Sequence, residues 1–223
     1  MPVSPTMRWN MNDTIRVNEQ FISIQGEGFY IGIPCYFIRL QGCDVNCRWC
    51  DSKATWDLDG GTMMTFQEIV DHIPNSINHV VITGGEPTLH GNLWGLIRSI
   101  AKNGYSVHIE TSGTHYDVLE DLCSLPWAWW ITLSPKYHRM PENIDTYLLA
   151  NEVKWIITER KDLDIVDAKW EELERLEQGV PLFYLQPVSC EEEATDLCVQ
   201  HVIKNADRDY RLSIQIHQYI GVK

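Results

Sequence analysis

Residues 42–51 of the chain read Gly42-Cys43-Asp44-Val45-Asn46-Cys47-Arg48-Trp49-Cys50-Asp51. The run holds three cysteines in the spacing C-x₃-C-x₂-C, and no fourth cysteine lies close by in the sequence. A closed tetrahedral zinc or iron–sulfur site takes four protein ligands. Three thiolates on a four-iron cubane leave one iron without a protein ligand, where a reactant can bind. The spacing therefore indicates a reactive iron–sulfur cluster, although half of a zinc site completed by a distant His or Cys also fits it.

The composition of the 223-residue chain limits its class. A hydrophobic content of 44%, with nine Trp and nine Tyr, supplies a globular core and argues against disorder. We expect residues 1–223 to form a single domain, in which residues 1–14 are a loose N-terminal extension with little periodicity. No apolar run reaches the roughly 18 residues that span a bilayer, and the first residues lack the pattern of a signal peptide. We therefore expect a cytoplasmic protein without membrane contact.

The charge and the cysteine count exclude further classes. The formal net charge of −13 at pH 7, with no basic stripe, argues against binding along a nucleic-acid backbone. The substrate is then expected to be small, and an anionic one must be held by a few placed cations. Seven cysteines without a secretion signal do not suggest a disulfide framework. The cysteines outside the cluster motif are expected to be reduced thiols among apolar neighbours: Cys35, Cys123, Cys190 and Cys198.

Short runs rich in β-branched and aromatic residues alternate with amphipathic segments. We predict strands over residues 35–41, 79–83, 106–110, 129–133, 152–157, 182–186 and 211–216. We predict full helices over 66–72, 90–103, 162–177 and 190–205, and weaker helical turns over 117–124 and 142–150. Thr65-x-x-Glu68 and Ser189-x-x-Glu192 have the pattern of capping boxes. Strands separated by helices predict right-handed βαβ units, and strands that are mostly apolar suggest a parallel sheet covered on both faces.

Six or seven strands with few full helices are too few for a complete (β/α)₈ barrel. Polar motifs follow the carboxyl ends of the predicted strands, where active residues of parallel α/β folds gather. In chain order these are the cysteine run, Gly84-Gly85-Glu86-Pro87, Glu110-Thr111-Ser112-Gly113, Ser134-Pro135-Lys136, Gln186-Pro187-Val188-Ser189 and His217. Each motif alone also fits an ordinary turn or cap. Their shared position predicts that they surround one mouth.

The cysteine spacing, with an aromatic Trp49 before the last cysteine, resembles the signature of the radical S-adenosylmethionine (SAM) superfamily. Gly84-Gly85-Glu86 resembles the motif whose backbone and carboxylate receive the amino group of SAM there. Across residues 18–221 the chain resembles the 7-carboxy-7-deazaguanine synthase family, through residues 23–28, 37–43, 49–53, 81–87, 109–114, 133–136, 185–189 and 212–219.

This resemblance implies an α/β fold, an incomplete and shortened (β/α) barrel, usually in a homodimer. It implies a lyase of queuosine and 7-deazapurine biosynthesis. The reaction converts 6-carboxy-5,6,7,8-tetrahydropterin to 7-carboxy-7-deazaguanine with loss of ammonia. The cofactors implied are a [4Fe–4S] cluster, SAM that is regenerated, and Mg²⁺. One electron from the cluster, supplied by a reducing protein such as flavodoxin or ferredoxin, would cleave SAM to a 5′-deoxyadenosyl radical.

The resemblance also implies roles for individual residues. Cys43, Cys47 and Cys50 would bind the cluster, and Ser52 would hold Mg²⁺. Many members have Thr at that last position, and Ser lacks the methyl group that stiffens the rotamer. SAM would be lined by Trp49, Cys50, Asp51, Gly85, Ser134, Pro135, Lys136, Gln186, Pro187, Val188 and Ser189. The pterin would contact Ile24, Gln25, Gly26, Glu27, Arg39, Thr83 and His217.

Two other interpretations remain open at this point. A glycyl-radical activase shares the cysteine triad, but it acts on a large protein partner and consumes SAM. A zinc-stabilised binding module would use the cysteines structurally. Arg39 is costly within an apolar strand unless it is paired, either with a structural carboxylate or with a substrate carboxylate. The Gln25-Gly26-Glu27-Gly28 run and Arg39 together favour a small carboxylated substrate.

Overall fold

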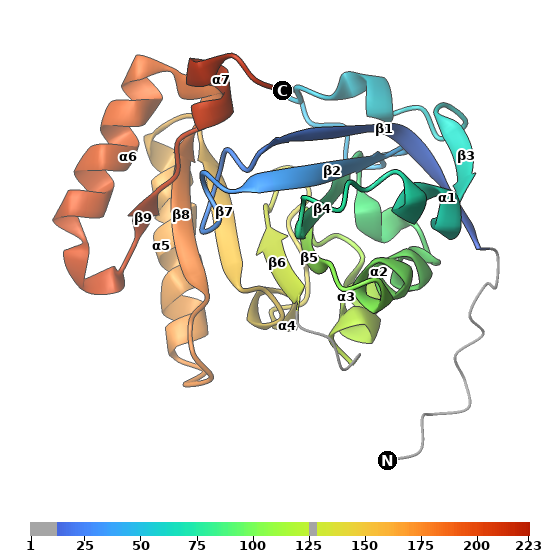
Figure 1. Cartoon of the computed structure of the whole chain (residues 1–223). Coiled ribbons are helices and arrows are strands. Elements are labelled where there is room, and N and C mark those ends of the chain that lie inside the picture. The colour runs from blue at the N-terminus through green and yellow to red at the C-terminus, as the bar shows by residue number, and fades with distance from the viewer. Residues whose placement is uncertain (1–12, 125–128) are drawn as a thin grey trace.

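The structure is a computed structural model that describes residues 13–124 and 129–223. Within these residues, nine strands form one curved sheet in the order β3-β1-β2-β4-β5-β6-β7-β8-β9 (Figure 1). The strands are β1 Thr14–Ile24, β2 Pro34–Leu40, β3 Thr62–Thr65, β4 His79–Gly84, β5 Ser106–Thr111, β6 Trp129–Leu133, β7 Glu152–Ile157, β8 Leu182–Pro187 and β9 Arg211–Leu212. The strands from β2 through β4 to β9 are all parallel, whereas β1 pairs antiparallel with β2 and β3. The predicted fold class, a mostly parallel α/β partial barrel, is confirmed.

All seven predicted strands are present, but two strands were missed and one was predicted too long. The missed strands are β1, whose middle is the polar run Asn18-Glu19-Gln20, and the four-residue β3. Thr14, which we had assigned to the loose extension, is the first residue of β1; residues 1–12 lie outside the described residues. The strand expected over 211–216 ends at Leu212, and helix α7 (Ile216–Ile220) follows.

The helices follow the predicted segments closely. They are α1 Phe66–Asp71, α2 Leu93–Lys102, α3 Tyr116–Cys123, α4 Asp145–Leu148, α5 Arg160–Glu174 and α6 Glu192–Lys204. The first capping box is confirmed, because Thr65 Oγ1 accepts from Glu68 N–H at 3.1 Å and Glu68 Oε2 accepts from Thr65 N–H at 2.7 Å. The second is wrong, because α6 is capped at Glu191 and Ser189 has a φ of +47° in the turn after β8. None of the helices in the described ranges is long and apolar enough to cross a bilayer.

The main core lies between the sheet and helices α1 to α6, which pack on one face (Figure 1). Side chains of β2 and β4 such as Ile38 and Ile82 are fully buried there with Leu96 of α2. Successive side chains of a strand point to opposite faces. The alternate residues therefore face the inside of the curve, and on β5 to β8 many of these are polar. The sequence predicted a sheet covered on both faces, whereas the inner face surrounds a cavity lined by many polar side chains.

The capping box predicts a measurable contribution to stability. Thr65→Ala should lower the melting temperature of the anaerobically purified protein by about 2–4 °C, because a lost cap costs about 1 kcal/mol. Thr65→Ser retains the hydroxyl acceptor and should melt close to the wild type. An equal loss in both variants would assign the effect to the threonine methyl group instead of the cap.

Candidate active site

A cavity of about 280 Å³ opens at the carboxyl ends of the parallel strands, inside the curve of the sheet. Its walls come from the β1–β2 loop, the cysteine loop after β2, the ends of β4, β5, β6 and β8, and helix α7. All residues to which the sequence analysis gave a role line this cavity, apart from Pro135. The shared mouth predicted from the strand ends is therefore present, while the role of each residue stays a prediction.

The cysteine loop presents three free thiols to the cavity. Cys47 is buried, whereas Cys43 and Cys50 are partly exposed. The backbone N–H of Ser52 donates to Cys50 Sγ at 3.4 Å, and hydrogen bonds to sulfur are one of the features that tune iron–sulfur clusters. Burial raises the pKa of the Cys47 thiol, and the positive charge of Lys136 opposes this rise. Three thiols that face one space beside a cation fit the donor set of a cluster.

A zinc ion and a cubane place different demands on three cysteines. Residues 13–124 and 129–223 contain no group of three His, Cys, Asp or Glu side chains arranged to hold a single metal ion. A tetrahedral zinc site draws its sulfurs to about 2.3 Å from one centre. In a cubane each thiolate binds a different iron, so the sulfurs stand further apart. A cluster therefore does not require the three sulfurs to converge on one point.

Two glycines bring the end of β4 against the cysteine loop. Gly84 has a φ of +137°, and a Cβ there would lie 2.3 Å from Leu40 O. A Cβ on Gly85 would lie 2.0 Å from Gly42 O. Gly85 N–H donates to Leu40 O at 3.1 Å, and Glu86 N–H donates to Gly42 O at 2.9 Å. Because both side chains are missing, the loop and the strand end meet through backbone hydrogen bonds.

The Glu86 carboxylate, only 1% exposed, joins the ends of β4 and β5. One oxygen accepts from Thr88 N–H at 3.0 Å and from the hydroxyls of Thr88 and Thr111 at 2.6 and 2.5 Å. The other accepts from the N–H and hydroxyl of Ser112 at 2.8 and 2.5 Å. These five donors already surround the carboxylate. Glu86 therefore positions the Thr111–Ser112 turn, and an amino group of SAM would share it with these donors.

Positive charge gathers on one wall of the mouth. Arg39 donates from Nε to Glu19 Oε1 at 2.9 Å and from Nη1 to Ser52 Oγ at 3.0 Å. Lys223 forms an ion pair with the other oxygen of Glu19. The Ser52 hydroxyl donates to Asp51 Oδ1 at 2.8 Å. In these contacts Arg39 uses two of its five N–H donors, so its guanidinium can receive a further anionic group beside Glu19 and Asp51.

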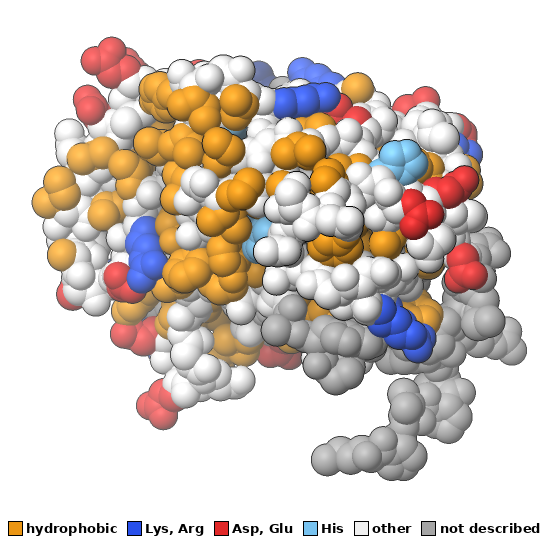
Figure 2. All heavy atoms as spheres, in the orientation of Figure 1, with side chains coloured by type: hydrophobic (Ala, Val, Ile, Leu, Met, Phe, Trp, Pro, Cys, Tyr) orange, Lys and Arg blue, Asp and Glu red, His pale blue; other side chains and the backbone are white. Residues whose placement is uncertain are grey.

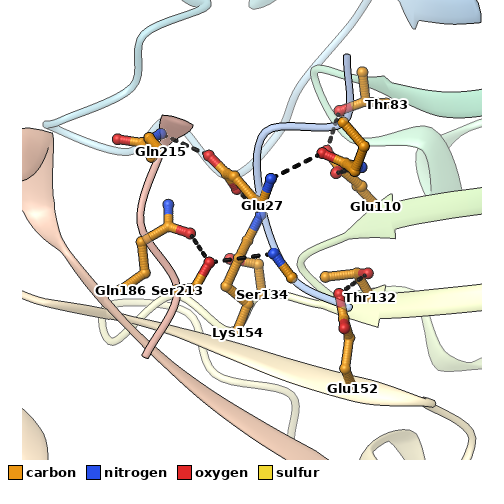
Figure 3. Close-up of polar contacts among 12 residues, drawn as sticks. Glu27, Thr83, Glu110, Thr132, Ser134, Glu152, Lys154, Gln186, Ser213 and Gln215 are labelled. Carbon is orange, nitrogen blue, oxygen red and sulfur yellow. Dashed lines mark hydrogen bonds and ion pairs between the residues drawn. The ribbon is translucent and has the colours of Figure 1, made fainter. Parts of the chain in front are cut away.

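The floor of the cavity carries a buried ion pair (Figure 3). Lys154, on β7, pairs with Glu27 Oε2, and Gln215 Nε2 donates to Glu27 Oε1 at 2.6 Å. Burial disfavours the charged carboxylate, but the charge and hydrogen bond of Lys154 more than offset it and hold the pKa of Glu27 at about 2. Glu27 is therefore ionised throughout the physiological range.

A second carboxylate lies beside this pair. Glu110, on β5, accepts from Gln25 Nε2 at 3.1 Å and from Thr83 Oγ1 at 3.1 Å (Figure 3). Burial lowers the pKa of Lys154, but the charge of Glu27 and then that of Glu110 raise it above its usual value. The floor thus contributes hydrogen-bond acceptors, whereas the mouth contributes cations.

The other predicted residues form the remaining walls. Lys136 Nζ donates to Ser134 Oγ at 2.7 Å, and burial lowers the pKa of Lys136 while the Cys47 thiolate would raise it. Gln186 accepts from Ser213 Oγ at 3.1 Å. A Cβ on Gly26 would lie 2.1 Å from His217 Nδ1, which places the imidazole directly against the β1–β2 loop.

Sequence reasoning missed several polar residues in and around the cavity: Glu19, Glu152, Lys154, Gln215 and Lys223. Of these, Lys154, Gln215 and Lys223 line the cavity, and Glu19 pairs with the lining residues Arg39 and Lys223. Glu152 accepts from Thr132 and Phe29, which do not line it. A signal for Lys154 was available, because a lysine within a largely apolar strand is costly unless paired, as was argued for Arg39. Its partner Glu27 lies 127 residues away in the sequence, so only the fold reveals the pair.

Comparisons with known proteins agree with this geometry. Residues 37–139 match the model of the radical SAM superfamily. The 7-carboxy-7-deazaguanine synthase of Buchnera aphidicola subsp. Schizaphis graminum is 36% identical and aligns over 93% of this chain and 98% of that protein. The enzyme of the same name from Synechocystis sp. is 38% identical, with 93% of each chain aligned.

Solved structures show the same relationship. The crystal structure of QueE from Escherichia coli superposes with a TM-score of 0.73 at 31% identity, covering 96% of this chain and 99% of that one. Streptococcus suis SuiB bound to SAM shares the fold alone, with a TM-score of 0.54 at 13% identity over 77% of this chain and 44% of that one. Radical SAM membership implies a [4Fe–4S] cluster and SAM, so the zinc-module interpretation is not supported. The chain belongs to the 7-carboxy-7-deazaguanine synthase family of the radical SAM superfamily.

Proposed function

We propose that this chain converts 6-carboxy-5,6,7,8-tetrahydropterin to 7-carboxy-7-deazaguanine with loss of ammonia, and that SAM is regenerated in each cycle. The observation that best supports this substrate is the polarity of the cavity. Arg39 and Lys223 lie at the mouth, and Glu27 and Glu110 lie at the floor. The pterin has the matching polarity, with a carboxylate on one ring and a row of N–H donors on the other.

The residues of the chain would bind and orient the pterin from both ends. Arg39 would hold the carboxylate, since its planar guanidinium presents two parallel donors. Ionised Glu27 would accept from the N–H edge of the pyrimidine ring, and a charged acceptor makes the stronger hydrogen bond. Ile24, Gln25, Gly26, Thr83 and His217 would complete the pterin contacts. Placement of the reacting carbons close together can contribute roughly 7–11 kcal/mol of the barrier reduction.

The residues present fit the implied cofactors. Cys43, Cys47 and Cys50 would hold the cluster, and the SAM contacts would be those the resemblance implies, with Pro135 acting only through the turn that it shapes. When bound, the cluster and SAM supply the one-electron chemistry that removes a hydrogen atom and returns it. Apolar side chains of Phe37 and Ile156 line the cavity and would exclude water from the reaction.

Mg²⁺ is a further proposed cofactor, with Ser52 as its protein ligand. The Ser52 hydroxyl donates to Asp51 and accepts from Arg39, which leaves it one lone pair for a metal. Mg²⁺ keeps several waters and binds through few protein oxygens plus substrate, so one hydroxyl near a substrate carboxylate suffices. The metal would bias the rearrangement as a Lewis acid.

We further propose that the chain acts as one radical SAM domain within a homodimer and receives electrons from a small reducing protein such as flavodoxin or ferredoxin. The family resemblance implies the homodimer, and a cluster that delivers one electron needs an electron donor. Figure 2 shows apolar side chains gathered over the region of α6, β9 and α7. Ile203 is 72% exposed there and Tyr219 67%, and β9 is an edge strand, features that favour association with another chain.

Anaerobic turnover tests the proposed reaction. The purified holoenzyme, incubated with SAM, dithionite and 6-carboxytetrahydropterin, should form a product lighter than the pterin by one ammonia, detected by mass spectrometry. Product should exceed SAM consumed. Cys47→Ala should lose both the brown cluster chromophore and the product. Stoichiometric 5′-deoxyadenosine without deazaguanine would contradict the proposal and favour the activase interpretation.

Substitution of Arg39 tests whether its guanidinium binds the carboxylate of the pterin. Arg39→Ala should raise KM for the pterin on the order of 10- to 100-fold, because a charge-assisted hydrogen bond to a carboxylate is lost. Iron content and chromophore should match the wild type, and Arg39→Lys should recover part of the loss. An unchanged KM would remove Arg39 from the substrate site.

Metal dependence tests the assignment of Ser52. Ser52→Ala should raise the Mg²⁺ concentration for half-maximal activity by about tenfold or more, as expected when a ligand that orients a metal is lost. Ser52→Thr restores the hydroxyl with a stiffer rotamer and should equal or improve on the wild type. Identical Mg²⁺ titrations of the alanine variant and the wild type would count against this ligand.

A further inference from the structure

We propose that Lys154 is a positioning residue: it holds Glu27 as an ionised hydrogen-bond acceptor facing the cavity, and through Glu27 it makes the site select a ring edge that carries N–H donors. This inference rests on the proposed pterin-binding function and deepens it. It assigns to Lys154 a role that acts through another side chain, since Lys154 need not touch the reacting atoms.

The geometry of the pair supports this role. Lys154 lies in the middle of β7, and Glu27 lies in the loop between β1 and β2 (Figure 3). Their side chains are 8% and 14% exposed, and both line the cavity. Lys154 Nζ donates to one carboxylate oxygen of Glu27, and Gln215 Nε2 donates to the other at 2.6 Å. Both oxygens are thus fixed, and the carboxylate has little freedom to turn away from the cavity.

Glu27 depends on Lys154 more than the neighbouring carboxylates do. Glu110 receives hydrogen bonds from two neutral side chains, and Glu152 receives them from Thr132 Oγ1 at 2.6 Å and Phe29 N–H at 2.9 Å. Of these three described carboxylates, it is Glu27 that forms the ion pair with Lys154. A buried charge without its partner is strongly disfavoured, so removal of Lys154 should act first on Glu27.

Other charged and titratable groups surround the pair from each element packed against it: Glu110 and His108 on β5, Glu152 on β7, Lys136 after β6, and His217 on α7. Burial raises the pKa of Glu27, and Lys154 with Gln215 and His217 lowers it to about 2. Without Lys154 the effect of burial dominates, and the carboxyl group takes up a proton at a higher pH. A protonated carboxyl group is a poorer acceptor for N–H donors.

The test measures equilibrium binding of 6-carboxytetrahydropterin to the anaerobic holoenzyme with SAM, between pH 6 and pH 8. The ratio of Kd for Lys154→Met to Kd for the wild type cancels the titration of the ligand itself. This ratio should rise about tenfold or more from pH 8 to pH 6, as Glu27 becomes protonated in the variant. In the Glu27→Gln background, Lys154→Met should have a smaller effect on Kd that does not vary with pH.

A lysine that only supports packing would weaken binding equally in both backgrounds and at every pH, and that result would overturn the inference. A second measurement avoids any dependence on folding of the variants at position 154. The infrared difference between the wild type and Glu27→Gln at pH 6 should show a carboxylate stretch; a protonated carboxyl band would also overturn the inference. If the wild type binds no pterin, the proposed function is overturned as well. If the wild type binds the pterin but the ratio of the two Kd values does not change with pH, only the role of Lys154 is overturned.

Discussion

The inner face of the curved sheet buries charged side chains, and each buried charge needs a partner to remain ionised. The ion pairs lie at two places in the cavity. Lys154 and Glu27 meet at the floor, while Arg39 and Lys223 share Glu19 at the mouth. Arg39 and Lys223 thus lie at the mouth, and the carboxylates of Glu27 and Glu110 lie at the floor. The substrate, its orientation and the selectivity are inferred from this placement of charges. The charges come from β1, β2, β5 and β7, from the β1–β2 loop and from the segment after α7.

A backbone constraint places the chemistry beside that cavity. Gly84 and Gly85 allow the end of β2 and the end of β4 to meet through hydrogen bonds, and the cysteine loop begins at that contact. Any side chain at Gly85 would collide with the backbone of the loop. The three thiols are consequently held over the same opening that the pterin would enter. Backbone contacts therefore set the position of the cysteine loop next to the cavity, whereas the charged side chains determine which ligand the cavity would bind.

Most of the parallel sheet could be predicted because its strands are short apolar runs that end in polar motifs, as in 79–83 followed by Gly84. Strand β1 was missed because it is half exposed and polar at its centre, and its antiparallel partners are chosen by tertiary packing. The Ser189 cap failed because a capping residue needs extended backbone, whereas Ser189 adopts a left-handed conformation. The motif residues could be placed around one cavity from the sequence, and most of them line it. Lys154 could not, because its partner Glu27 is brought to it only by the fold.

The most direct test of this account is an anaerobic crystal structure of the holoenzyme with SAM and 6-carboxytetrahydropterin bound. The account predicts that the pterin carboxylate lies within hydrogen-bond distance of Arg39, and that the N–H edge of the pyrimidine ring meets Glu27, with Lys154 still paired behind it. A pterin bound in the reverse orientation, or bound outside the cavity, would contradict the central claim that the opposed charges of the cavity select and orient the substrate.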